Sequence, residues 1–303
     1  MKGVCGMWFF ISFVALLCWS GSDLFCKLGS SPEDKHSHLK MIMVLGFSMG
    51  IHGIIQVTTA KVSITGYDVK MYLPVILFSI VVMSVGFIGL RYIELSISSP
   101  ICNSSGAIVI ILSVCLLGQT INRIQMIATG MILFCILTMS IMVWTEDDTH
   151  RKERQEEAKI KYPKSKIGLM ISLTYCMLCG IGNFAEVLVL QKIDEGAANI
   201  IYEFTFFCAA VLVLFYLKLI KREKILKKRE LPKLLGAIFE TAGQYAYMYA
   251  VAKNAFLAVP VIYSYCMGSI VWGRLFLGEE LTIKQYLVLF VGILGIVILG
   301  AVG

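Results

Sequence analysis

A carboxylate and an ammonium group interrupt the first apolar stretch of this sequence. Residues 16–30 read LLCWSGSDLFCKLGS, and Asp23 and Lys27 stand one helical turn apart in them. Two explanations are open: a local ion pair whose lysine reaches toward water, or an aspartate that binds a cationic group of a ligand. An unpaired carboxylate in apolar surroundings is costly, so either explanation requires a specific partner.

Glu240 is a second isolated carboxyl, in the apolar segment AIFETAGQYAYMYA. Lys233 is the one basic residue within two helical turns of it, and Gln244 and Tyr247 continue its stripe at i+4 and i+7. A carboxyl in such surroundings is suited to exchange a proton with a transported solute or with water. The alternative is a protonated structural carboxyl that is hydrogen-bonded to another helix.

The elements that carry these residues are long and apolar. Hydrophobic residues make up 58% of the 303 residues, charged residues make up 16%, and the mean hydropathy is +0.80. The charges are clustered and leave stretches close to the roughly 20 residues that cross a bilayer of about 30 Å. Ten such spans are predicted at 7–27, 41–60, 71–90, 98–117, 125–144, 167–190, 198–220, 234–252, 255–277 and 284–302. The sequence therefore predicts an all-α integral membrane protein with ten transmembrane helices.

The longest gap between spans is the charged segment TEDDTHRKERQEEAKIKYPKSK. It predicts a first five-helix repeat at residues 1–144, a charged linker at 145–166 and a second five-helix repeat at 167–303. The first span resembles a secretory signal, but nine further spans follow it, which favours a retained first helix.

An offset of 160 residues aligns the two halves at several separate places. It pairs Pro100 with Pro260, Ser104 with Ser264, Gly118 with Gly278, and Gln125 with Gln285. It also places Trp19, Ser22, Asp23 and Cys26 on Cys179, Gly182, Asn183 and Glu186, with helical spacing i, i+3, i+4, i+7 in both halves. Because each half has an odd number of spans, the second must be inverted in the membrane. Secondary transporters with such inverted repeats bind their solute near the midplane, between the halves.

The expected site follows from these stripes. The candidate substrate-binding residues are Trp19, Ser22, Asp23, Asn183, Glu186, Tyr247 and Tyr263, and the candidate coupling residue is Glu240. Other polar residues have plainer explanations beside a functional one. Glu203 and Arg274 could reach the membrane interface by snorkelling. The tyrosines between residues 245 and 265 suit either an aromatic-walled pocket or interfacial anchoring, and Pro100 and Pro260 could each open a helix.

The sequence resembles the EamA family of the drug/metabolite transporter superfamily. Trp19 with Lys27 eight residues later, and the LGEE ending at Leu277 to Glu280, are similar to the half-repeat signatures of that family. Three features depart from it: Ser20 stands where a glycine usually follows the tryptophan, Gln119 replaces a glutamate, and no proline lies midway along the fourth or ninth span. The resemblance implies uptake or export of small metabolites, commonly amino acids, nucleotide-related compounds or sugars, without ATP.

Other chemistry finds little support. Cys176 and Cys179 form a CMLC pair without a partner pair, and the four histidines form no ligand cluster, with His36 and His38 expected in a solvated loop. No Walker loop or hydrolase motif is present, so we expect no cofactor, no metal and no nucleic-acid partner. The expected partners are a small-molecule substrate and the lipid bilayer, and the sequence does not give the oligomeric state.

The preferred interpretation is a secondary transporter in a plasma or inner membrane. Two alternatives remain: an intramembrane enzyme, which would need catalytic groups at one depth, and a non-transporting membrane scaffold or sensor, which would need no polar stripes. Six basic residues lie beside the spans on the side of the termini, and twenty lie on the other side. The positive-inside rule therefore predicts both termini outside, whereas the family layout suggests cytoplasmic termini.

Overall fold

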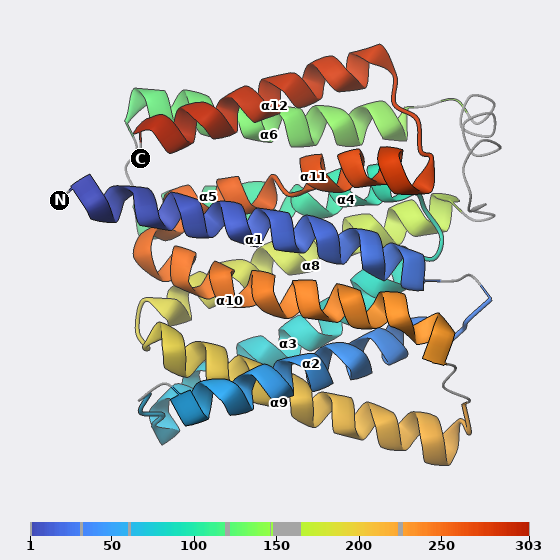
Figure 1. Cartoon of the computed structure of the whole chain (residues 1–303). Coiled ribbons are helices and arrows are strands. Elements are labelled where there is room, and N and C mark those ends of the chain that lie inside the picture. Colours follow the sequence, from blue (N-terminus) through green and yellow to red (C-terminus); the bar gives the residue numbers. More distant parts are fainter. Residues whose placement is uncertain are drawn as a thin grey trace.

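The computed structural model describes residues 2–30, 33–59, 62–118, 122–145, 147, 165–223 and 227–302, and their regular structure is entirely helical (Figure 1). A backbone in lipid must satisfy its hydrogen bonds within its own segment, which selects helices. The first half contains α1 (Lys2–Gly29), α2 (Ser37–Thr59), α3 (Gly66–Gly89), α4 (Leu95–Asn103), α5 (Ser105–Leu117) and α6 (Arg123–Trp144). The second contains α8 (Ser165–Leu190), α9 (Glu195–Phe215), η1 (Tyr216–Ile220), α10 (Lys227–Tyr263), α11 (Cys266–Trp272), η2 (Gly273–Leu277) and α12 (Ile283–Val302).

Each of the ten predicted spans lies on one helix or on consecutive helices of the described chain, and the eighth and ninth spans share α10, whose backbone leaves the helical conformation between them at Asn254. Within the described ranges, five helices are long and apolar enough to cross a membrane: Met7–Gly29, Ser37–Thr59, Gly66–Gly89, Ile167–Leu190 and Glu195–Ile220. The observed ends differ from the predicted ones where polar caps extend a helix. At the start of α3, for example, Thr65 and Asp68 form a reciprocal capping box, so the helix begins at Gly66 rather than at residue 71.

The fourth and ninth spans are both interrupted in the middle. α4 ends at Asn103 and α5 begins at Ser105, while α10 ends at Tyr263 and α11 begins at Cys266. The expectation that Pro100 and Pro260 open their helices is wrong, because each lies inside a helix, four residues before an interruption. Proline removes one backbone donor, and the following serines add competing donors: Ser104 Oγ donates to the Pro100 carbonyl and Ser264 Oγ to the Val261 carbonyl.

A pair of left-handed glycines marks the end of these two broken spans. Gly118 follows α5 with φ 61°, and Gly278 follows η2 with φ 71°. Glycine adopts this conformation without the steric cost of a Cβ atom. Both positions are related by the sequence offset, so the two halves end their fourth helix in the same way.

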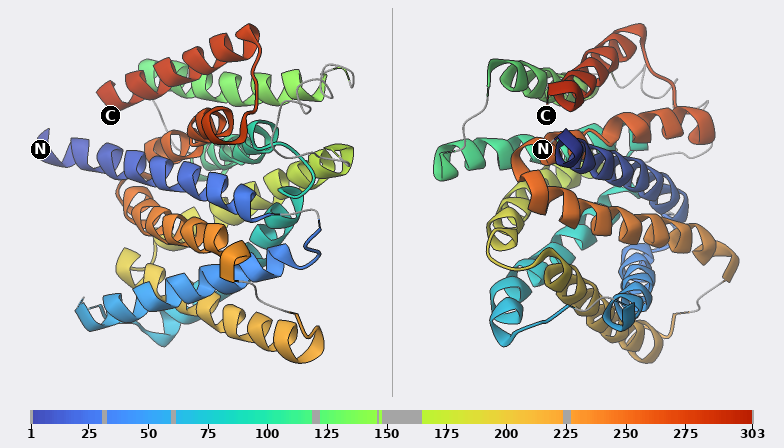
Figure 2. Two further views of the ribbon diagram at one scale, coloured as in Figure 1. Left: turned by 45° about the vertical axis from the view of Figure 1, so that its right-hand side comes forward. Right: turned by 60° about the vertical axis from the view of Figure 1, so that its left-hand side comes forward.

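The helices pack in pairs that each combine the two halves. α1 packs against α10, and its repeat partner α8 packs against α3, while α2 contacts α9 and α6 contacts α12. α1 and α8 run in opposite directions through the bundle, and both chain ends lie at the same end of it (Figures 1 and 2). The α2–α9 contact is close: a Cβ atom on Gly46 would lie 2.2 Å from the Phe206 carbonyl oxygen. The protein is therefore an all-α membrane protein built from two inverted repeats.

Charged side chains join the two halves at the end of the bundle opposite the termini. Asp34, before α2, pairs with Lys40 at 3.0 Å and with Lys233 of α10 at 3.8 Å. His36 is half-buried rather than free in solvent, because its Nδ1 lies 2.7 Å from Glu223 Oε1. This contact lowers the pKa of Glu223 below its ordinary value. His38, also expected in the loop, lies within α2 and is half-buried.

Candidate functional site

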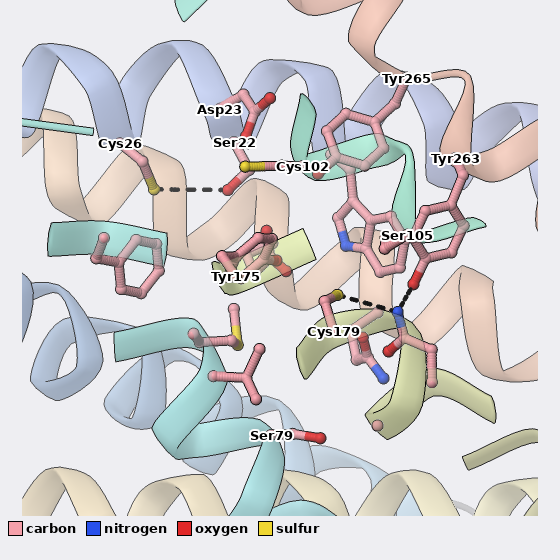
Figure 3. A pocket seen from close by; sticks show the side chains of 18 of the residues that line it. Ser22, Asp23, Cys26, Ser79, Cys102, Ser105, Tyr175, Cys179, Tyr263 and Tyr265 are labelled. Atoms are coloured by element: carbon pink, nitrogen blue, oxygen red, sulfur yellow. Dashed lines mark hydrogen bonds between the residues drawn. The ribbon is translucent and has the colours of Figure 1, made fainter. Parts of the chain in front are cut away.

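A cavity lies between the two halves, in the middle of the bundle. It contains about 830 Å³ of atom-free space, including its open mouth. α1, α3, α8, α9 and α10 contribute to its wall, together with both broken spans. Figure 3 shows Ser22, Asp23 and Cys26 along α1, facing Tyr175 and Cys179 of α8 across this space.

The structure brings most of the candidate residues together at this cavity. Seven of the eight line it: Trp19, Ser22, Asp23, Asn183, Glu186, Tyr263 and Glu240. The eighth, Tyr247, is 1% exposed and lies behind the wall, with its ring 5.1 Å from that of Trp19. Every member of the two stripes related by the sequence offset also faces the cavity, including Cys26, Cys179 and Gly182.

Asp23 is held from both broken spans. Ser99 Oγ on α4 and Ser269 Oγ on α11 each donate to Asp23 Oδ2 at 2.7 Å. Asp23 Oδ1 accepts no hydrogen bond from the described residues, and the side chain lines the cavity. One carboxylate oxygen is therefore fixed by the scaffold while the other remains available to a ligand.

Lys27 neither pairs with Asp23 in the expected way nor reaches the membrane interface. It is 0% exposed, and its Nζ donates to the carbonyls of Leu90 and Ile93 between α3 and α4. The carboxylates of Glu94 and Glu279 lie close enough to attract its charge. The turn after α3 leaves helical carbonyls without partners, and these are stronger acceptors for a buried ammonium than distant water.

Glu240 lies on the face of α10 that is packed against α1. It is partly buried and lines the cavity, and Ser22 on α1 lies beside it and donates to the Gly236 carbonyl at 3.0 Å. Asp23 is close enough for the two carboxylates to repel each other. Glu240 therefore contributes a second carboxyl to the cavity wall.

Glu186 and Asn183 are positioned by tyrosines from other helices. Tyr72 Oη on α3 donates to Glu186 Oε1, and Asn183 Nδ2 donates to Tyr263 Oη and to Cys179 Sγ. Glu186 is 4% exposed, so its carboxyl depends on such donors. The Tyr72–Glu186 bond joins α3 to α8 across the boundary between the halves, and the Asn183–Tyr263 bond joins α8 to the ninth span within the second half.

Aromatic rings surround Trp19. The rings of Tyr263 and Tyr265 lie 6.1 Å and 5.7 Å from it, at interplanar angles of 79° and 70°. Such edge-to-face packing is favourable and fixes the indole in one orientation. Tyr175 and Tyr202 complete the aromatic wall of the cavity.

Several residues of the site escaped the sequence analysis. Ser99, Ser269 and Tyr72 hold the carboxylates, and Tyr175 and Tyr202 line the wall. Ser99 had one available signal, since it directly precedes Pro100 inside a broken span. The others have ordinary sequence surroundings, and only the packing of α3, α8, α9 and α11 brings them to the cavity.

Several other polar and aromatic residues named in the sequence analysis lie outside the cavity wall. Glu203 does not reach the interface: it is 0% exposed, with its Oε1 2.6 Å from His52 Nδ1 and 2.9 Å from Asn199 Nδ2. Arg274 pairs with Glu280 at the surface. Tyr245 and Tyr249 line a separate apolar groove between α1, α2 and α10. Among the described residues, no group of three or more His, Cys, Asp or Glu side chains could hold a metal ion.

Two inverted five-helix halves with a polar cavity between them define the architecture of a membrane transporter. The profile of the EamA-like transporter family matches residues 6–141 and 166–301, once in each half, and the chain belongs to this family. Membership implies transport and confirms the resemblance read from the sequence. This is a transporter family and not an enzyme family, so the expectation that the chain is not an enzyme is confirmed.

The fold is shared with a solved structure titled "Crystal structure of protein". The TM-score is 0.66 at 13% sequence identity, over 98% of this chain and 99% of that chain. This likeness shows the fold alone. A search of curated proteins found no match.

Proposed function

We propose that the protein is a secondary active transporter that moves a small organic metabolite through the cavity between its two halves. The observation that carries the proposal is the position of the two offset-related stripes. Trp19, Ser22, Asp23 and Cys26 from the first half and their four counterparts from the second all line one cavity. A cavity built equally from inverted halves can open to either side of the membrane by rocking one half against the other.

The proposed substrate contacts are those predicted from the sequence. Asp23 offers its available Oδ1, Asn183 and Glu186 offer polar groups from the opposite half, and the rings of Trp19 and Tyr263 bound the space. Tyr247 supports the site indirectly, because its ring packs against the indole of Trp19.

Glu240 is the proposed coupling residue. Glu240 lines the same cavity as Asp23. The described residues that line this cavity include no basic side chain. A carboxyl at this position can take up a proton from one side and release it to the other as the cavity alternates. The free energy of a proton gradient, rather than ATP, would then drive solute movement.

The proposed organisation has repeats at residues 1–144 and 167–303 with a linker at 145–166. Support comes from the family match, which covers one segment in each half. We place the protein in a plasma or inner membrane with both termini outside, which follows from the twenty basic residues beside the opposite ends of the spans.

Flux measurements in proteoliposomes test the proposal. The purified chain is reconstituted and offered a pooled metabolite library with and without a pH gradient across the vesicle membrane. We expect selective uptake or exchange that depends on the gradient. Glu240→Gln should fold and still bind solute, but its transport rate should no longer depend on pH. Glu280 is an exposed carboxyl at a helix end, so Glu280→Gln should transport like wild type.

Two results would count against the proposal. Glu240→Gln transport with an unchanged pH profile would show that Glu240 is a structural carboxyl. Absence of flux, exchange and ligand-induced stabilisation for every library member would instead favour a membrane scaffold or sensor.

A further inference from the structure

The charges that face the cavity all have the same sign. Among the described residues, its lining contains three carboxyl groups, from Asp23, Glu186 and Glu240, and no lysine, arginine or histidine. These carboxyls come from three different helices, α1, α8 and α10. A site with this lining repels anions and favours a ligand that carries positive charge.

The basic side chains nearest to the cavity are engaged at the end of the bundle. Lys27 donates to the Leu90 and Ile93 carbonyls, and Lys233 pairs with Glu230 at 2.9 Å and with Asp34 at 3.8 Å. Both lysines are at most 3% exposed, so moving either ammonium group toward the cavity would break its present contacts. Both lysines are thus held by other partners and do not belong to the lining of the cavity.

The walls of the cavity suit an organic cation rather than a bare ion. Six aromatic residues line it: Trp19, Phe87, Tyr175, Tyr202, Tyr263 and Tyr265. The faces of such rings attract ammonium groups, and their apolar area binds the carbon skeleton that carries the charge.

The wall of the cavity also contains an amide group, that of Gln244, which can bind a ligand. Gln244 lines the cavity and is 5% exposed, and its Nε2 lies near the Glu186 carboxyl but has no hydrogen-bond partner in the described residues. A buried amide donor without a partner is costly, and a ligand with an acceptor oxygen would satisfy it. This observation concerns a side chain other than the three carboxyls and points to the same space.

We propose that the transported solute is a small organic cation whose ammonium group binds Asp23 Oδ1, whose carbon skeleton lies against the ring of Trp19, and which offers an oxygen to Gln244. The inference rests on the proposed transport function and names its substrate class. Asp23 is suited to this role because Ser99 and Ser269 fix its Oδ2, whereas Oδ1 accepts no hydrogen bond from the described residues and the side chain lines the cavity.

A set of probes of similar size and different charge tests the inference. Binding of 2-phenylethylamine, 2-phenylethanol and 3-phenylpropanoate to the purified full chain is measured by calorimetry. Members of a second set that add an ether oxygen to the same skeletons are measured alongside. We expect the cation to bind at least tenfold more tightly than the neutral alcohol, the anion not to bind, and the ether oxygen to improve cation binding.

Variants identify the residues responsible. Asp23→Asn should weaken cation binding at least tenfold and leave the neutral alcohol unchanged, and Gln244→Leu should remove the gain from the ether oxygen. Glu280→Gln removes the same charge outside the cavity and should bind every probe like wild type. If Asp23→Asn does not fold, the charge series on the wild-type chain still decides the matter. Equal or tighter binding of the anion, or loss of cation binding in Glu280→Gln, would overturn the inference.

Flux of the same probes separates this inference from the proposed function. Cation binding without flux in proteoliposomes would support the cation site and contradict transport. Flux confined to neutral or anionic solutes would support transport and overturn the cation site.

Discussion

Ser269 Oγ on α11 donates to Asp23 Oδ2 on α1 at 2.7 Å, and this bond joins the two halves of the protein at the candidate site. Ser99 on α4 makes the equivalent bond from the first half. The carboxylate therefore lies between two broken spans, and any rearrangement of those spans changes its orientation.

Loss of one serine hydroxyl should weaken solute affinity. Ser269→Ala leaves Asp23 with one donor, so we expect KM to rise by about 10- to 150-fold, the equivalent of one hydrogen bond to a charged group of about 1.5–3 kcal/mol, with kcat unchanged. Ser269→Thr keeps the hydroxyl and should restore KM. Initial rates of uptake in proteoliposomes measure both values, and an unchanged KM in Ser269→Ala would show that the bond does not position Asp23.

Removal of the buried ammonium group should destabilise the protein. Lys27→Met keeps the side-chain length but leaves the Leu90 and Ile93 carbonyls without their donor and Glu94 and Glu279 without a nearby cation. We expect a loss of about 3–5 kcal/mol, typical of breaking a buried charge contact. Lys35→Met, at an exposed position of the neighbouring loop, is the control. Equal melting temperatures of the two variants in detergent would contradict the assignment.

Glu279 and Glu280 are adjacent, yet they should respond very differently to substitution. Glu279 is 2% exposed and accepts from the Leu95 and Ser96 backbone N–H groups at 3.0 Å and 2.8 Å, so it caps α4 from the other half. Glu279→Ala should cost about 1–3 kcal/mol, because it removes a helix cap and leaves buried donors without partners.

Glu280 provides a matched control for this cap. Its side chain is 45% exposed and pairs with Arg274, so Glu280→Ala should cost no more than about 1 kcal/mol. Chemical denaturation of both variants in micelles compares them, and a similar stability would mean that the contact between the halves at α4 does not depend on Glu279.

Membrane orientation can be decided by cysteine labelling. A cysteine placed in the basic linker, for example at Thr149, would lie outside the described residues. Lys35 therefore serves as the marker for the end of the bundle that carries most of the basic residues. Ile64, 41% exposed between α2 and α3, marks the opposite end. In intact cells an impermeant thiol reagent should label Ile64→Cys and not Lys35→Cys, each compared with the unsubstituted chain. The reverse pattern would place both termini in the cytoplasm.

The sequence determined the class of the protein because lipid imposes simple rules. Clustered charges and apolar stretches of membrane length predicted helices that cross a bilayer, and an odd number of spans in each half predicted inverted repeats. The 160-residue offset survives in the backbone, since Gly118 and Gly278 share the left-handed conformation and Ser104 and Ser264 share the helix break. These are local properties, which neighbouring residues dictate.

Contacts between distant helices were decided only by the tertiary structure. Helical spacing placed Asp23 and Lys27 on one face and suggested an ion pair, but the fold offers Asp23 two serines from other helices and offers Lys27 two carbonyls beyond α3. Tyr72 is separated from its partner Glu186 by 114 residues. A buried polar group bonds to whichever complementary partner packing brings within reach, and that choice depends on how the helices pack together, which helical spacing along one segment does not reveal.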